Sequence, residues 1–78
     1  MNGAFKTHRR ELGANIRKIR ESRGLSTRVF CGMIGLNRRD LALIERGSIS
    51  PKVVTLERIA AGLEVSVSSL VDFQTDGD

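Results

Sequence analysis

Three arginines in the middle of the chain carry its most distinctive chemistry: Arg38, Arg39 and Arg46. If this segment is helical, Arg39 and Arg46 lie on the face opposite Leu41 and Ile44. A guanidinium can donate two parallel hydrogen bonds to a guanine edge, and an α-helix fits the major groove of duplex DNA. The spacing is compatible with a DNA-recognition helix and equally with an ordinary solvated arginine face.

The sequence lacks the side chains that catalysis and metal binding require. The 78 residues contain one cysteine, Cys31, and one histidine, His8, so they provide no internal disulfide and no metal site of known spacing. No nucleophile, base and orienting group can be assembled, and no glycine-rich phosphate loop is present. We therefore expect no enzyme activity, no cofactor, no small-molecule substrate and a structural role for Cys31. A single cysteine also fits a cytoplasmic location.

Charge is unevenly distributed along the chain. Lys and Arg total 13 against nine Asp and Glu, a net charge of +4. Residues 1–46 contain 11 basic and four acidic side chains, net +7, whereas residues 47–78 contain two basic and five acidic, net −3. The basic half predicts a polyanionic partner, nucleic acid first and an anionic membrane surface second. No apolar stretch approaches the roughly 20 residues that cross a bilayer, so we expect no membrane-spanning segment. With nucleic acid as the favoured polyanion, we expect no membrane partner.

Hydrophobic spacing predicts an all-α protein whose helices position these side chains. Leu12, Ile16 and Ile19 recur at the spacing of one helical face. The five expected helices cover about residues 8–23, Thr27–Ile34, about Arg38–Arg46, about Val53–Gly62, and a short last segment with Leu70 and Val71. We expect a single domain over residues 1–78, with its core at about 8–71 and a loose acidic tail at 72–78.

Capping residues support these boundaries. The first three helices end at Gly24, Gly35 and Gly47, and the second and third have Ser26 and Asn37 as N-caps. Asp40 lies where it can complete the second of these caps, and Pro51 suits the first turn of the fourth helix. Only Gly35 and Leu36 separate the second helix from the cap of the third. So short a link predicts a helix-turn-helix.

The segment from Ser26 to Gly47 carries a family pattern, with Phe30, Cys31, Gly35, Leu41 and Ile44 in register. It resembles the helix-turn-helix of lambdoid phage repressor and Cro proteins and of the xenobiotic-response-element regulators. The flanks are similar too, in Leu12-Gly13-Ala14-Asn15-Ile16-Arg17-Lys18-Ile19-Arg20, Ile44-Glu45-Arg46-Gly47 and Leu56 to Leu70. The likeness covers residues 12–71 and implies a five-helix, lambda-repressor-like fold. A restriction-modification controller protein or a small phage repressor would suit so short a chain.

The resemblance implies a DNA-contact role for nine side chains. The base contacts would come from Arg38, Arg39, Ala42 and Leu43. The phosphate contacts would come from Thr27, Arg28, Asn37, Arg46 and Ser48. Arginine would favour guanine, and the apolar side chains could pack on thymine methyl groups. Four positions depart from the expected pattern, namely Thr27, Val29, Cys31 and Asp40. The family usually has glutamine in place of the shorter Thr27, an acidic residue in place of Val29 and a small alanine in place of Cys31, and Asp40 suits nearby phosphates only if the helix cap holds it.

Two further groups of residues are expected to hold the structure together and not to contact DNA: an ion pair and a dimer interface. Arg20 and Glu45 resemble the family's buried ion pair between the first and third helices, with a surface bridge as the alternative. The dimer interface would use apolar residues outside the DNA face, namely Val65, Val67, Leu70, Val71 and Phe73. A small core and a single recognition helix both favour dimerisation.

Together these features predict a sequence-specific regulator that binds double-stranded DNA. It would act as a homodimer on a palindromic, two-fold operator, as a repressor or autoregulator. The alternative from another class is an antitoxin-like protein-interaction module, whose apolar C-terminal half would bind and neutralise a partner protein. The salt dependence of DNA affinity distinguishes the two, because only the regulator loses affinity steeply as salt rises.

Overall fold

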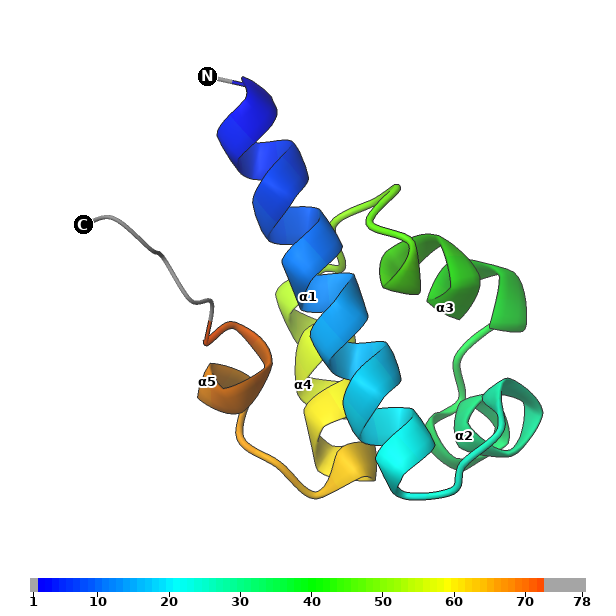
Figure 1. Cartoon of the computed structure of the whole chain (residues 1–78). Helices are drawn as coiled ribbons and strands as arrows, with labels where there is room; N and C mark the ends of the chain where they lie inside the picture. The colour runs from blue at the N-terminus through cyan, green and yellow to red at the C-terminus, as the bar shows by residue number, and fades with distance from the viewer. Residues whose placement is uncertain (1, 73–78) are drawn as a thin grey trace.

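Five helices make up the part of the chain that the computed structural model describes, which is the backbone of residues 2–72 and the side chains of residues 8–72. They are α1 (Asn2–Ser22), α2 (Thr27–Ile34), α3 (Arg38–Glu45), α4 (Val53–Leu63) and α5 (Val67–Leu70), and no strand occurs among these residues. The long α1 crosses the molecule, with α2 and α3 on one side, α5 on the other and α4 behind it (Figure 1). The expected all-α architecture is confirmed. None of these helices is both long and apolar enough to span a membrane.

Local capping contacts define the helix-turn-helix. Ser26 Oγ accepts a hydrogen bond from the Val29 amide at 3.1 Å, and Asn37 Oδ1 accepts one from the Arg39 amide at 2.7 Å. Gly35 has a φ of 68°, a left-handed conformation that glycine adopts at little cost. The chain therefore turns from α2 into α3 within the short link that the sequence predicts.

Three details differ from the expected boundaries. α1 begins at Asn2, not at about residue 8, because the expectation depended on an apolar stripe that starts only at Leu12, whereas a helix can extend beyond the core it packs on. Lys52 is the N-cap of α4, so Pro51 precedes the cap and is not in the first turn. Asp40 is exposed, and no hydrogen bond between described residues joins it to the cap of α3.

The core is mainly aliphatic, as the composition predicts. Its buried members are Leu12, Ile16, Phe30, Cys31, Ile34, Leu41, Ile44, Ile59, Ala60, Leu63 and Leu70. All five helices contribute, and burial of apolar surface stabilises each of them by about 25 cal/mol per Å². This packing is essential for α2 and α3, which have eight residues each, because isolated helices of that length are marginal in water.

Two glycines allow pairs of helices to approach closely. A Cβ atom at Gly13 of α1 would overlap the backbone carbonyl oxygens of Ile44 and Glu45 in α3. A Cβ atom at Gly62 of α4 would likewise overlap the side chain of Ile34 in α2. The first contact holds α3 directly against the backbone of α1, and it is one that the sequence analysis did not identify.

Candidate nucleic-acid interface

α3 buries one of its faces and exposes the other. Leu41 and Ile44 have only 0% and 2% of their surface exposed, and both belong to the core. On the opposite side Arg38, Arg39 and Ala42 are exposed and Leu43 is partly exposed. This division follows the helical spacing of 100° per residue. All four residues expected to contact bases therefore have accessible surface.

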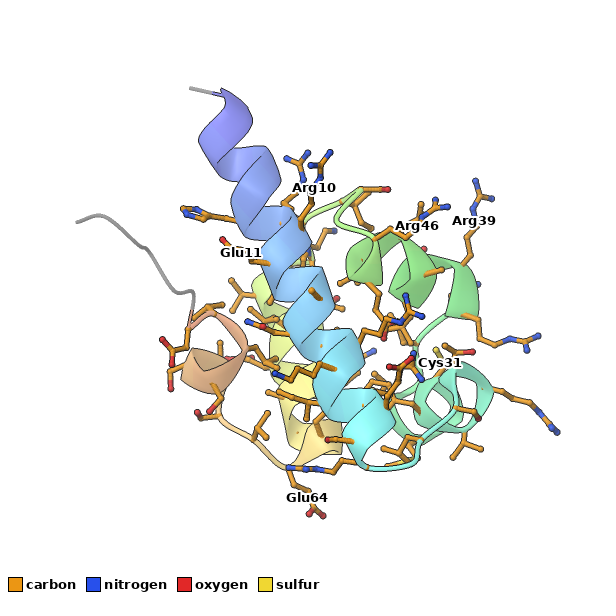
Figure 2. The ribbon with its side chains drawn as sticks, in the orientation of Figure 1. Arg10, Glu11, Cys31, Arg39, Arg46 and Glu64 are labelled. Carbon is orange, nitrogen blue, oxygen red and sulfur yellow. The ribbon has the colours of Figure 1, made fainter. Side chains whose placement is uncertain are left out.

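The exposed side of α3 that begins with Arg38 and Arg39 continues to Arg46 at the end of the helix, and we call it the arginine face. Arg46 is the C-cap of α3 and keeps a helical backbone, with φ −81° and ψ −9°. It follows Arg39 by two helical turns, so the two residues point within about 20° of each other and are about 10 Å apart along the axis. Both side chains extend away from the body of the molecule at the same edge (Figure 2).

The expected phosphate contacts lie around the starts of α2 and α3 and just after α3. Like Arg46, the side chains of Thr27, Arg28, Asn37 and Ser48 are exposed. The first amides of a helix have no acceptor within it, and the Ser26 side chain occupies only the Val29 amide of α2. Free amides at a helix start can hold a phosphate oxygen.

A buried ion pair joins the end of α3 to α1. Arg20 Nε and Nη2 donate to Glu45 Oε2 and Oε1 at 2.8 and 3.1 Å, and Arg20 Nη1 donates to the Leu25 carbonyl at 2.6 Å. The Arg20 and Glu45 side chains are 7% and 8% exposed, so the pair is buried and is not a surface bridge. The hydrogen bond from Arg20 to Glu45 raises the pKa of Arg20. Since Glu45 directly precedes Arg46, the pair also orients the arginine face.

A second connection between α1 and the end of α3 uses residues that the sequence analysis did not single out. Arg9 Nε donates a hydrogen bond to the Gly47 carbonyl at 3.3 Å. Gly47 has a φ of 77°, and a Cβ atom there would lie 2.7 Å from Arg10 Cα. The basic pair Arg9-Arg10 is visible in the sequence, but only the fold brings it to the turn after α3.

The remaining reactive side chains do not gather into a site. Cys31 is 3% exposed, and burial raises the pKa of its thiol, as expected for a structural cysteine. Within residues 8–72 there is no group of three or more side chains that could hold a metal ion. What the surface offers around α3 is a set of guanidinium and amide donors on a projecting helix face, which suits a polyanionic ligand.

Comparison with known proteins assigns the family. Residues 11–72 match the family model of a helix-turn-helix domain. The chain belongs to the helix-turn-helix family. Its members are DNA-binding transcription regulators and not enzymes, which confirms the expected class of protein.

Individual relatives of this helix-turn-helix protein are regulators. It is 36% identical over 62 residues to the HTH-type transcriptional regulator SutR of Escherichia coli strain K12, covering 80% of this chain and 35% of that one. It is 36% identical over 64 residues to the immunity repressor protein of Bacillus phage phi105, covering 82% and 44%. It thus spans less than half the length of these two curated relatives.

A solved structure gives a match of more similar length. The restriction-modification controller protein C.AhdI from Aeromonas hydrophila has a TM-score of 0.77 at 26% identity, covering 80% of this chain and 94% of that one. All three names describe regulators, so the comparisons do not favour the antitoxin-like alternative.

The structure changes the predicted dimer surface of this helix-turn-helix protein. Leu70 is 0% exposed and belongs to the core, so its assignment to the dimer interface is wrong. A short helix can turn its one large apolar residue toward the core or toward a partner, and four residues of spacing do not distinguish the two. Val65 and Val67 are partly buried against the core, and Val71 is exposed. Phe73 lies outside the described residues.

Two exposed valines were missed by the sequence analysis. Val53 and Val54, at the start of α4, are 71% and 63% exposed, more than Val71 at 40%. The sequence signals that at least one of them is exposed, because adjacent residues point about 100° apart on a helix and a narrow core-facing stripe cannot take both. They are additional candidates for a subunit contact.

Proposed function

We propose that this protein is a sequence-specific regulator that binds double-stranded DNA in the cytoplasm, as a homodimer on a palindromic operator, and acts as a repressor or autoregulator. The observation that carries the proposal is the exposed arginine face of α3, backed by the buried side chains of Leu41 and Ile44 and by the Arg20–Glu45 pair. Family membership accounts for DNA binding in general. Three points go beyond family membership: the residues that contact DNA, the binding of two subunits and the repression or autoregulation that binding causes.

Base recognition would use the middle of the exposed face. Arg38 and Arg39 would donate to guanine O6 and N7, and Ala42 and Leu43 would pack on thymine methyl groups. Their exposure on one side of a helix supports this assignment, because a helix placed in the major groove presents one face to the base edges.

Phosphate contacts would flank the base contacts. Thr27, Arg28 and Asn37 would hold phosphates at the starts of α2 and α3, and Arg46 and Ser48 would hold them beyond the end of α3. Such contacts fix the position of the protein on the duplex but carry no sequence information directly. Their exposure and the free amides of the first turns support these roles.

Two subunits are needed because one recognition helix contacts only a few base pairs. In a two-fold dimer the two recognition helices would enter major grooves about 34 Å apart. The subunit contact would use the exposed valines of the C-terminal half, Val53, Val54 and Val71. A repressor role is supported by the name of one similar protein, the phage immunity repressor.

A titration of fluorescently labelled duplex DNA tests the proposal. DNA affinity should fall between about 50 and 200 mM salt, with a log–log slope of about −0.9 for each phosphate that the protein neutralises. Selection of bound sequences from a random pool should then return a palindrome with half-sites about 10 base pairs apart. Affinity that is negligible, or independent of salt, would contradict the proposal.

A further inference from the structure

The part of α1 around Arg9 and Arg10 lies against the chain that leaves the recognition helix. Arg9 Nε donates to the Gly47 carbonyl at 3.3 Å, and Gly47 has no room for a side chain because Arg10 Cα and Arg10 N would lie 2.7 and 2.9 Å from its Cβ atom. Gly47 follows Arg46 directly. Arg10 is therefore held next to the end of the arginine face, although it is 36 residues away in sequence.

Three guanidinium groups extend from this edge of the molecule. Figure 2 shows the side chains of Arg39, Arg46 and Arg10 pointing away from the body in a similar direction, from the start of α3, the end of α3 and α1 in turn. All three residues are exposed. The row of positive charge is thus longer than α3 itself, because α1 extends it beyond Arg46.

Arg10 differs from the other arginines of α1 because its guanidinium takes part in no hydrogen bond or ion pair between described residues. Arg17 pairs with Glu21 on the same helix, and Arg20 pairs with Glu45. Among the described residues no ion pair involves Arg10. Its guanidinium therefore keeps its hydrogen-bond donors for a ligand, and a guanidinium binds a phosphate by two parallel hydrogen bonds.

We propose that Arg10 is a further DNA-backbone contact of this protein, binding a phosphate next to the one contacted by Arg46. Arg9 acts as a positioning residue, because its bond to Gly47 holds the turn that sets Arg10 beside Arg46. The contact carries no sequence preference, since Arg10 lies outside the recognition helix and at the margin of the groove. This inference rests on the proposed function and adds a contact site on α1.

The test measures the salt dependence of DNA binding for the full chain and matched variants. The probe is a fluorescently labelled, mixed-sequence duplex of about 20 base pairs, or about two helical turns. Arg10→Gln removes the charge, and Arg10→Met also removes it while keeping an aliphatic stem against Gly47. Lys18→Gln is the control, because it removes one positive charge from the part of α1 that faces Ser69 and Asp72. Circular dichroism checks the helix content of each variant.

Both Arg10 variants should bind more weakly at low salt, with a log–log slope that is shallower by about 0.9. Lys18→Gln should bind like the wild type. The inference is overturned if the Arg10 variants keep the wild-type slope, or if Lys18→Gln lowers the slope equally, which would indicate an effect of total charge. The proposed function survives both of these outcomes, and it fails only if the wild type itself shows no salt-dependent binding.

Discussion

Burial decides what arginine does at different positions of this chain. Arg20 has its donors occupied by Glu45 and by a backbone carbonyl, so it holds two helices together. Arg39 has the same chemistry but is exposed, and no ion pair between described residues involves it. The helical spacing of α3 predicted the outward position of Arg39, whereas the buried position of Arg20 was implied by the family resemblance. The sequence could not predict the role of Arg10, because the contact between Arg10 and Gly47 depends on how α1 packs against the turn after α3.

At α3, Arg39→Ala should relax the preference at one base position, at a cost of about 1–3 kcal/mol for the preferred sequence, because a bidentate contact to a base is lost. Arg46→Ala is the comparison, and it should weaken binding to all sequences alike and make the salt slope shallower by about one unit. The measurement is sequence selection from a random pool followed by titration. An unchanged sequence profile for Arg39→Ala would show that this residue does not contact bases.

The buried ion pair gives a stability prediction. Glu45→Ala should lower the free energy of unfolding by about 3–5 kcal/mol, because it leaves the buried charge of Arg20 without its partner. Arg17→Ala is the control, since it breaks only the exposed bridge to Glu21 and should cost less than about 1 kcal/mol. Urea denaturation monitored by circular dichroism measures both. Equal effects of the two substitutions would mean that the buried pair contributes no more than a surface bridge.

The elements of this fold were predictable where their ends are set by neighbouring residues. Ser26 and Gly35 define the two ends of α2, and Asn37 defines the start of α3, as the structure shows. The start of α1 was not predictable from the apolar stripe, because that stripe marks the packed part of a helix and not its whole length. The inward direction of Leu70 depends on how α5 packs, which short-range spacing does not contain.

Two glycine substitutions separate packing between helices from helix propensity. Gly13→Ala should destabilise the fold by about 1–3 kcal/mol and weaken DNA binding, because its methyl group would push α3 away from α1. Gly32→Ala should stabilise the fold by about 0.5–1 kcal/mol, because Gly32 lies inside α2 with no atom close to the position of the added methyl group. Thermal unfolding of both variants checks the signs. Stabilisation by Gly13→Ala would contradict the close contact between α1 and α3.

At the scale of the whole molecule, the basic half of the chain and the two most exposed large apolar side chains of the described residues, Val53 and Val54, lie apart in the sequence. The +7 half contains α1, α2 and α3 with the arginine face, and the −3 half contains α4 and α5 with Val53, Val54 and Val71. One part can therefore bind DNA while the other contacts a second subunit. The sequence indicated this division of charge, but only the structure shows that Leu70 is buried and that Val53 and Val54 are exposed.

The proposed subunit contact on the C-terminal half can be tested by its effect on dimer formation. Val53→Glu should shift the protein from dimer toward monomer, weakening self-association by about tenfold or more, or about 1.4 kcal/mol, because a carboxylate would be buried in the subunit contact. Met33→Glu is the matched control, since Met33 is also exposed, by 56%, but lies on α2. Sedimentation without DNA measures both. Wild-type association of Val53→Glu would place the subunit contact elsewhere on the chain.

The firm anchoring of α3 also bears on how this protein can change its target. Leu41, Ile44 and Glu45 are tied to the core, and they alternate with the positions that face outward. In the proposed complex with DNA, exchanging Arg38, Arg39, Ala42 and Leu43 would therefore alter the preferred operator while leaving the fold intact. Duplicated copies of the chain could diverge in target by a few substitutions, without any compensating change in the interior.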